Sequence, residues 1–287
     1  MRTGLLGVVG YPVGHSVSPQ MVNAALRHAG VDNVLYISVE VKPRDLQAFC
    51  RSARLLNFIG FNVTIPHKVS VIKYLSRLDS SAKQVGAVNV VKVVGEKLVG
   101  FNTDVHGVMH SVPSKRDVDG GVVVLGVGGA ARAAAVALKR KGFAEIVFAY
   151  RRMKTAREFK RFAESRRIGC RLVRMGSDEM AEEMRRCGLL INATPVGMHP
   201  HTRASPIASN LIHRRMTVFD MVYNPPETKL LKAAKARGAE TINGVNMLVA
   251  QGAEALKIWL RLEADRKVME KAVVDALKMF SRRRTIT

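Results

Sequence analysis

The chain has 287 residues, which at about 150 residues per domain suggests two domains, and 47% of the residues are hydrophobic. Its 46 Lys and Arg against 23 Asp and Glu give a formal net charge of +23, which attracts anions without distinguishing phosphates, carboxylates and nucleic acid. No apolar run approaches the roughly 20 residues of a membrane span, and the N-terminal segment is too short and too interrupted by glycine for a signal sequence. The three scattered cysteines and the eight histidines show no spacing typical of disulfides or metal ligands. We therefore expect a folded cytoplasmic protein without a metal.

Short apolar segments alternate with helical patterns along almost the whole chain. This alternation predicts an α/β fold with mostly parallel sheets. We expect Ser18 to cap the first helix, Pro19 to occupy its first position and Gly30 to follow its end. Gly95 and Glu96 lie between two apolar segments, so a hairpin there would make the first sheet mixed. The predicted strands cover residues 5–9, 34–39, 58–63, 87–94, 98–101, 122–125, 146–150, 189–191 and 218–222.

A polar, turn-rich stretch at residues 111–121 divides the chain. We place an α/β substrate-binding catalytic domain at residues 1–110 and a Rossmann-type domain at 111–243, where the strand, glycine turn and helix pattern restarts. The segment 244–287 contains two long predicted helices, 247–260 and 263–280, which we expect to pack back on the first domain. The basic tail Arg282-Arg283-Arg284 is more typical of a solvated terminus than of a nucleic-acid-binding arm.

The predicted strand 122–125 leads directly into a glycine-rich turn and then into helix 133–141. Gly126 permits the turn, Gly128 lets backbone amides approach a pyrophosphate, and Ala131 fits where helix and strand pack closely. The helix N-terminus adds free amides and a positive dipole. The pattern therefore predicts dinucleotide binding by Gly126, Val127, Gly128, Gly129 and Ala130.

The next strand favours NADP over NAD. An NAD-binding strand usually ends in Asp or Glu, about 20 residues on, which accepts from the ribose 2′-hydroxyl. Here strand 146–150 ends at Tyr150 and is followed by Arg151 and Arg152, whose guanidinium groups suit a 2′-phosphate. A solvated basic face is the alternative, because Arg and Lys continue along the next helix. The sequence does not decide whether Arg152 and Lys154 contact the cofactor.

Polar side chains also follow the strands of the first half. Ser16 and Ser18 lie at the start of the first helix, where free amides favour a carboxylate. Lys68 follows a hydrophobic strand, and Asp104 follows the hairpin. A lysine and an aspartate in one small-molecule cleft make a proton-transfer pair in which the carboxylate orients the ammonium. The amides and the hydroxyl at these strand edges are Asn62, Thr64, Asn89 and Asn102.

The chain carries these motifs in order: His15-Ser16-Val17-Ser18-Pro19, Asn62-Val63-Thr64-Ile65-Pro66-His67-Lys68, Gly86-Ala87-Val88-Asn89, Asn102-Thr103-Asp104, Gly126-Val127-Gly128-Gly129-Ala130, Asn192-Ala193-Thr194-Pro195-Val196-Gly197-Met198, Asp220-Met221-Val222-Tyr223, and residues 244–251 from Gly244 to Gln251. In this order and spacing the chain resembles the shikimate dehydrogenase family over nearly its whole length. The resemblance implies reversible NADPH-dependent reduction of 3-dehydroshikimate to shikimate, a step of chorismate and aromatic amino acid biosynthesis.

The resemblance also implies roles for individual residues. Lys68 would be the general acid and base, and Asp104 its catalytic partner. The substrate carboxylate would be held by Ser16, Ser18 and Tyr223, and the ring hydroxyls by Thr64, Asn89, Asp104 and Gln251, with Asn62 beside them. The cofactor would be bound at its pyrophosphate by residues 126–130, near its 2′-phosphate by Tyr150, Arg151 and Arg152, and at its nicotinamide end by Thr194, Met221 and Gly244. Met198 and Met247 are equally compatible with the core, and His15, His67 and His106 with neighbours of the cleft.

The sequence departs from the family pattern in two places and leaves alternatives open. Tyr150-Arg151-Arg152 replaces a common Asn-Arg-Thr, and Ser80, beside Asp79, replaces a frequent acidic residue. A quinate or dual quinate/shikimate dehydrogenase is the nearest alternative. The 6% aromatic content and the spread of charge disfavour a nucleic-acid-binding protein, and the lysine and aspartate disfavour a non-catalytic NADP sensor. We expect a small-molecule substrate, no nucleic-acid or membrane partner, and a monomer or homodimer.

Overall fold

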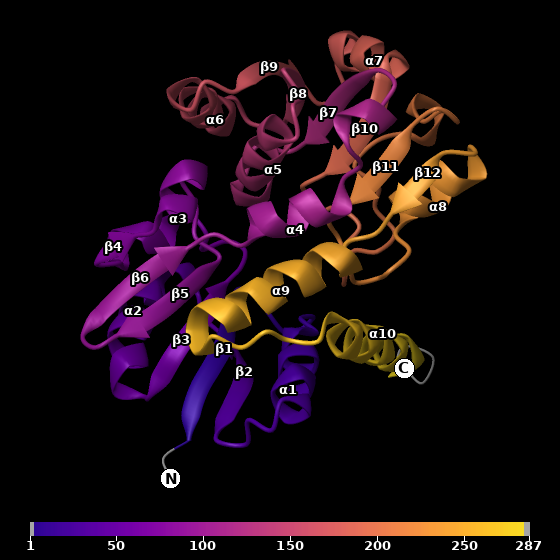
Figure 1. Cartoon of the computed structure of the whole chain (residues 1–287). Coiled ribbons are helices and arrows are strands. Elements are labelled where there is room, and N and C mark those ends of the chain that lie inside the picture. Colours follow the sequence, from indigo (N-terminus) through magenta and orange to yellow (C-terminus); the bar gives the residue numbers. More distant parts are fainter. Residues whose placement is uncertain (1–2, 284–287) are drawn as a thin grey trace. The chain divides into compact units, whose positions relative to one another are not determined.

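The computed structural model describes residues 3–283, apart from the side chains of 281–283, so Arg284 and the side chains of Arg282 and Arg283 lie outside the described residues. The described chain is an α/β protein with two six-stranded sheets (Figure 1). It divides into two compact units. Unit 1 contains the residues up to Thr103 and those from Val249 onward, and unit 2 contains Asp104–Leu248. The predicted fold class is confirmed.

The sheet of unit 1 is mixed, as the hairpin at Gly95 predicted. Its strand order is β2-β1-β3-β5-β6-β4, and β5 runs antiparallel to both β3 and β6 while the other pairs are parallel. Gly95 adopts a φ of 55° in the hairpin turn, a conformation that glycine reaches at little cost. The strands are β1 (Gly4–Gly10), β2 (Val34–Glu40), β3 (Phe58–Val63), β4 (Arg77–Leu78), β5 (Val90–Val94) and β6 (Lys97–Phe101).

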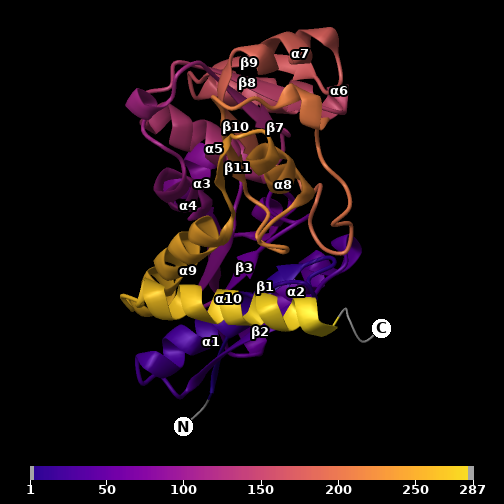
Figure 2. The ribbon, with the colours of Figure 1, turned by 90° about the vertical axis from the view of Figure 1, so that its right-hand side faces the viewer.

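The helices of unit 1 pack on this sheet and on one another. Helix α10 lies beside α1 and packs against it (Figure 2). The aromatic rings of Phe49, Phe58 and Phe61 meet edge to face between α2 and β3, with centroids 5.1–6.3 Å apart. The helices are α1 (Ser18–His28), α2 (Leu46–Leu55), α3 (Ser80–Val85), α9 (Val245–Leu260), which begins in unit 2, and α10 (Arg266–Arg283), with short 3-10 turns at Pro43–Asp45 and Ser70–Tyr74.

The predicted cap of the first helix is wrong. Helix α1 already includes Ser18 as its first residue, and Val17 is the N-cap, without a side-chain cap hydrogen bond. The Ser16 hydroxyl instead accepts a hydrogen bond from the Ser18 backbone N–H, at 3.2 Å. The hydroxyl that meets a backbone amide at the start of α1 is therefore that of Ser16, one residue before the N-cap, and not that of Ser18.

The sheet of unit 2 is parallel throughout, with the strand order β12-β11-β10-β7-β8-β9. This is the doubly wound arrangement expected of a Rossmann-type unit. Its strands are β7 (Gly121–Leu125), β8 (Glu145–Tyr150), β9 (Gly169–Arg174), β10 (Cys187–Asn192), β11 (Thr217–Asp220) and β12 (Glu240–Ile242). Its helices are α4 (Asp104–Ser111), α5 (Gly129–Arg140), α6 (Met153–Ser165), α7 (Asp178–Arg185) and α8 (Lys229–Ala236), with 3-10 turns at Lys115–Asp117 and Ser209–Leu211.

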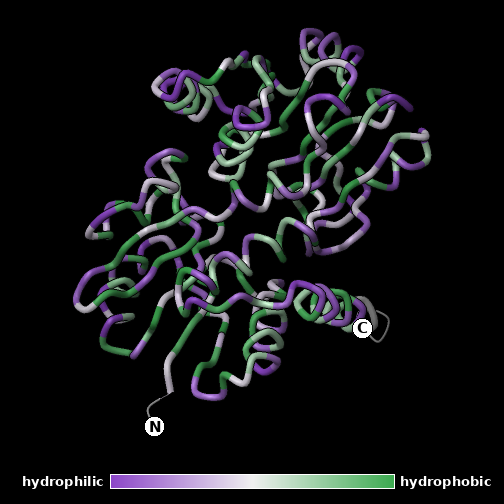
Figure 3. Tube along the Cα trace, in the orientation of Figure 1, coloured by the Kyte–Doolittle hydropathy of each residue, from purple (hydrophilic) through white to green (hydrophobic). Residues whose placement is uncertain are grey.

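Hydrophobic residues follow the strands within each unit, whereas hydrophilic residues gather on loops and on outer helix turns (Figure 3). In unit 2, strand residues such as Leu125 and Leu190 and the helix residues Met184 and Ala234 are fully buried in one cluster. In unit 1, Val9 and Phe61 form part of a comparable cluster. Each sheet therefore carries its own apolar core, and the loops at the strand ends are left for polar groups.

Several predicted boundaries differ from the structure. Strand β5 begins at Val90, so residues 87–89 precede it, and β11 ends at Asp220, so residues 221–222 follow it. Helix α5 begins at Gly129 within the glycine motif, and α10 begins at Arg266 because Asp265 accepts hydrogen bonds from the backbone amides that follow it. None of the helices among residues 3–283 is long and apolar enough to cross a membrane.

Candidate active site

Most of the predicted substrate-binding residues of unit 1 meet at one edge of its sheet. Strands β1 and β3 are parallel neighbours, so their carboxyl ends lie together and are followed by Ser16 and by Thr64. Strand β5 is antiparallel to β3, so its start, preceded by Asn89, lies at this same edge. Strand β6 reverses direction again, and its end is followed by Thr103. The topology thus brings together residues that are up to 87 positions apart (103 minus 16).

A hydrogen-bond network fixes the amides at this edge. The Asn89 side chain accepts from the Thr103 backbone N–H at 2.7 Å and donates to the Thr103 hydroxyl at 2.9 Å. It also donates to Gln251 Oε1 at 3.3 Å, and the Thr103 hydroxyl donates to the same oxygen at 3.4 Å. All three residues are buried. Hydrogen bonds therefore connect three side chains that come from the start of a strand, from a loop and from a helix.

Asn62 belongs to the same network. It lies on β3, and its Nδ2 donates to the Asn89 carbonyl at 3.1 Å while its Oδ1 accepts from the Tyr36 hydroxyl at 2.6 Å. Sequence reasoning did not single out Tyr36 and gave no role to Thr103. Thr103 lay in a quoted motif and could have been found there, but no local pattern links Tyr36 to a strand that is not its neighbour.

Lys68 is half-buried in the loop after β3, and its carbonyl accepts from the Val88 backbone N–H at 2.7 Å. This bond ties the lysine's backbone to the segment that carries Asn89. Asp104 is buried and is the first residue of α4, where a carboxylate interacts favourably with the helix dipole. It follows Thr103 directly in the chain and belongs, like Tyr223, to unit 2.

The histidines near these motifs have structural partners. His67 is fully buried, and its Nε2 lies 2.7 Å from the Val41 carbonyl, which makes Nε2 the protonated nitrogen. The rings of His106 and His110 stack with centroids 4.4 Å apart. Within the residues that the structure describes, no group of three or more His, Cys, Asp or Glu could hold a metal ion.

The glycine-rich turn of unit 2 has the geometry of a dinucleotide site. Gly126 has a φ of 104°, and a side chain there would also approach Thr194 Cγ2 at 3.0 Å. Gly128 is the N-cap of α5, and a Cβ built on it meets no described atom within 4 Å. The fold therefore requires glycine at position 126, whereas Gly128 keeps open the space in front of the α5 amides. An anion suits that position.

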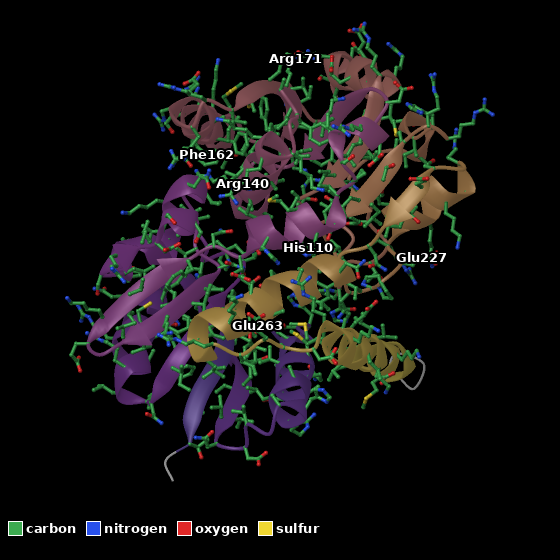
Figure 4. The ribbon with its side chains drawn as sticks, in the orientation of Figure 1. His110, Arg140, Phe162, Arg171, Glu227 and Glu263 are labelled. Atoms are coloured by element: carbon green, nitrogen blue, oxygen red, sulfur yellow. The ribbon has the colours of Figure 1, made fainter. Side chains whose placement is uncertain are left out.

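Arg151 and Arg152 are exposed between β8 and α6, and Arg152 is the N-cap of α6. The next helix turns continue the basic surface. Further along α6 lies Phe162, which is labelled in Figure 4. The guanidinium groups of Arg132 and Arg166 lie over its ring, 5.0 and 4.9 Å from the ring centroid. Burial, and then the nearby charge of Arg166, lower the pKa of Arg132. These guanidinium groups stack on an aromatic ring, whereas Arg151 and Arg152 are placed at the end of a strand.

Asp220 organises the loops after β10 and β11. Its carboxylate accepts from Asn192 Nδ2 at 2.9 Å, from the Val222 backbone N–H at 3.0 Å and from the Thr228 hydroxyl at 2.6 Å. Asn192 in turn accepts from the Thr194 N–H and hydroxyl at 3.0 and 2.7 Å. Sequence reasoning quoted Asp220 and Asn192 in motifs without assigning them a role.

These bonds hold the segments that carry the predicted nicotinamide-end residues. Met221 lies between Asp220 and Val222, and its N–H donates to the Asn192 carbonyl at 3.1 Å. A Cβ on Gly244 would lie only 2.4 Å from the Met221 carbonyl oxygen, so glycine is required for this close approach. Thr194 and Met221 are thereby linked through Asn192, and Gly244 packs against the backbone of Met221.

The cysteines are free thiols. Cys50 and Cys187 are buried and Cys170 is half-buried. Burial raises the pKa of Cys50 and of Cys170 to about 11 and that of Cys187 to about 12, so all three stay protonated near neutral pH.

Asp79 precedes Ser80, the position where the sequence departs from the family pattern. It caps α3 by accepting a hydrogen bond from the Ser81 N–H at 2.9 Å. Burial opposes its ionisation, but the hydrogen bonds from Ser81 and Ser80 outweigh burial and lower its pKa.

Comparison with known proteins agrees with this geometry. The family described as "Shikimate dehydrogenase substrate binding domain" matches residues 8–91, and "Shikimate 5'-dehydrogenase C-terminal domain" matches residues 244–274. A shikimate dehydrogenase (NADP(+)) of Methanopyrus kandleri is 40% identical over 96% of this chain and 97% of its own length. The chain belongs to the shikimate dehydrogenase family.

Solved structures extend the likeness to this family. The Thermus thermophilus shikimate 5-dehydrogenase, solved with NADP(H) and shikimate, has a TM-score of 0.82 and 33% identity, covering 96% of this chain and 100% of that one. Quinate dehydrogenase from Corynebacterium glutamicum, solved with NAD, has the same TM-score of 0.82 at 28% identity, covering 96% and 100%. The shikimate dehydrogenase fold therefore also occurs with another substrate and another cofactor.

Proposed function

We propose that the protein catalyses the reversible NADPH-dependent reduction of 3-dehydroshikimate to shikimate. The single observation that supports this most is the buried network of Asn89, Thr103 and Gln251 at the edge of the unit 1 sheet. Such a set of donors and acceptors suits a small polyhydroxylated ring bearing a carboxylate. The family membership and the glycine turn of unit 2 support the same activity.

The residues of unit 2 fit NADP. The open space in front of Gly128 and the free amides at the start of α5 suit the pyrophosphate. The exposed Arg151 and Arg152 follow the next strand, where the ribose 2′-phosphate of a dinucleotide is recognised. When bound, NADPH supplies the hydride. Thr194, Met221 and Gly244 would border its nicotinamide end, and residues 126–130 its pyrophosphate.

Lys68 and Asp104 would move the proton. During reduction the Lys68 ammonium donates a proton to the substrate carbonyl oxygen, and in the reverse direction the neutral amine takes it from the hydroxyl. The Asp104 carboxylate would orient that ammonium group. Ser16, Ser18 and Tyr223 would hold the substrate carboxylate, while Asn62, Thr64, Asn89 and Gln251 would bind ring hydroxyls.

The decisive experiment measures cofactor reduction by the purified protein over a grid of shikimate or quinate with NADP or NAD. We expect shikimate with NADP to give the highest kcat/KM. Quinate carries an additional hydroxyl on the carbon that bears the carboxylate, and burying it without a partner costs about 1 to 3 kcal/mol, or roughly 10- to 100-fold in discrimination. Equal efficiency on both substrates would indicate the dual-specificity alternative, and inactivity in all four combinations would refute a dehydrogenase.

We also predict that the enzyme acts in the cytoplasm as a monomer or homodimer. Cell fractionation tests the first part of this prediction, and size-exclusion chromatography tests the second.

A further inference from the structure

Tyr36 lies on β2, two strands away from Asn62, and its hydroxyl crosses β1 to reach the Asn62 side chain. The residue is 1% exposed, and its hydroxyl lies 2.6 Å from Asn62 Oδ1. In the sheet register, Leu6 of β1 pairs with Tyr36 on one side and with Gly60 on the other, so Tyr36 and Asn62 lie one pleat apart on the same face. This contact joins the edge strand of the sheet to the candidate substrate site.

The contacts of Asn62 determine which end of its carboxamide faces which way. The Asn89 carbonyl accepts from both the Val63 backbone N–H at 2.9 Å and Asn62 Nδ2 at 3.1 Å. A carbonyl cannot donate, so the nitrogen of the carboxamide faces Asn89 and the oxygen faces Tyr36. The tyrosine hydroxyl is the donor to that oxygen. Because these two bonds fix the plane of the carboxamide, they also fix the direction in which the second Nδ2 hydrogen points.

Tyr36 is itself held in place at three points. Asn23 of α1 accepts from the Tyr36 N–H at 2.9 Å and donates to the Tyr36 carbonyl at 2.8 Å. The tyrosine ring lies against the indole of Trp259, with centroids 6.3 Å apart. That indole donates to the Val91 carbonyl at 2.9 Å and occupies the space above Gly60, where a Cβ would be 2.2 Å from its nitrogen. The hydroxyl therefore has little freedom to leave Asn62.

We propose that Tyr36 is a positioning residue that fixes the Asn62 carboxamide for hydrogen bonding to a substrate hydroxyl. This inference rests on the proposed function, in which Asn62 belongs to the substrate site. Without the hydroxyl, Asn62 Oδ1 loses a buried donor and the carboxamide can rotate toward another. A net hydrogen bond is worth about 0.5 to 1.5 kcal/mol, which corresponds to a roughly 2- to 13-fold effect on binding.

The test compares Tyr36→Phe, Asn62→Ala and the double variant in steady-state assays with shikimate and NADP. We expect Tyr36→Phe to raise KM for shikimate about 2- to 13-fold while KM for NADP stays within twofold. If Tyr36 acts through Asn62, the double variant will be no worse than Asn62→Ala alone. The matched control is Tyr74→Phe, which removes a tyrosine hydroxyl elsewhere in unit 1 and should leave both KM values unchanged.

The outcomes separate this inference from the proposed function. A strong effect of Asn62→Ala with none of Tyr36→Phe would overturn the positioning role and leave the proposed function intact. No effect of Asn62→Ala would remove Asn62 from the site and with it the reason for the inference. If the effects of the two single substitutions on KM for shikimate multiply in the double variant, Tyr36 does not act through Asn62. The same holds if Tyr36→Phe changes KM for shikimate and KM for NADP equally. Either result would mean that Tyr36 acts only on the stability of unit 1. Thermal unfolding of each variant shows whether it is folded at the assay temperature.

Discussion

The buried carboxyl group of Asp220 leads to a measurable pH dependence of stability. Asp220 is fully buried at the end of β11 and accepts three hydrogen bonds. Burial raises its pKa to about 6 from 3.8, and the hydrogen bonds from Thr228, Val222 and Asn192 offset only part of this rise. Between these two pH values the folded chain therefore holds a proton that the unfolded chain has released.

The sign of the effect follows from proton binding. Where the folded state binds more protons than the unfolded state, the free energy of unfolding falls as pH rises. Asp220 therefore favours the folded state most below about pH 4, and this contribution is lost as pH rises through about 6. The difference between about 6 and 3.8, at about 1.4 kcal/mol per pH unit, amounts to about 3 kcal/mol.

The substitution Asp220→Asn isolates this contribution. Asparagine has nearly the same shape, and its oxygen can still accept from Asn192 and from the Val222 N–H, while its amide can donate to the Thr228 hydroxyl. It carries no charge that burial would penalise. We therefore expect the variant to gain stability relative to the wild type as pH rises, by up to about 3 kcal/mol, with most of the change between about pH 4 and pH 6.5.

Chemical denaturation across this pH range, followed by far-UV circular dichroism, measures the effect. Tryptophan fluorescence is unsuitable because the single tryptophan, Trp259, lies in unit 1, whereas Asp220 lies in unit 2. The matched control is Asp119→Asn, which neutralises an exposed aspartate of the same unit. Its free energy of unfolding relative to the wild type should change little with pH. A difference between wild type and Asp220→Asn that stays constant with pH would refute the reasoning.

Three further predictions test the candidate site. Lys68→Ala should leave NADP affinity nearly unchanged in a binding titration and lower kcat by about 10²- to 10⁴-fold, with Asp104→Asn acting similarly; near wild-type turnover in either would contradict the acid–base pair. Arg151→Ser should raise KM for NADP much more than KM for NAD, and an unchanged ratio would place Arg151 on a solvated basic face. Gly128→Ala should keep the unfolding temperature and weaken NADP binding, whereas Gly126→Ala, at a φ of 104°, should lower the unfolding temperature itself.

The sequence was most informative where a local signal and a strand coincided. Strands β1, β2, β3, β7, β8 and β10 were predicted within two residues because each is a short apolar run bounded by turns. Strand β9 was missed because two of its six residues, Arg171 and Arg174, are basic and interrupt the apolar run. Arg171, labelled in Figure 4, pairs with Glu145, Glu179 and Glu183. Strand β4 has two residues and leaves no periodicity to detect. Pairing with the neighbouring strands, and not the intrinsic β-propensity of their residues, defines these two strands.

The candidate site was predictable as a list of residues but not as a network. Motifs indicated Asn89 and Gln251 separately, yet their contact spans 162 positions of sequence, and no local pattern encodes it. The position of Ser16 as acceptor for the Ser18 N–H also depends on where α1 starts, which a capping pattern fixes only to within a residue or two. Long-range hydrogen bonds are decided by the sheet order, and the sequence specifies that order only through the whole fold.

The reversed direction of β5 explains why Asn89 is central to the unit 1 network. In a wholly parallel sheet this edge would carry only the residues that follow strands, whereas the antiparallel β5 contributes the residue that precedes one. The Asn89 N–H donates to the Phe101 carbonyl at 3.1 Å and its carbonyl accepts from Val63 at 2.9 Å, so its backbone continues both ladders. Because a slip of one residue would turn the Asn89 side chain to the opposite face, the register of β5 between β3 and β6 sets the orientation of the candidate substrate site.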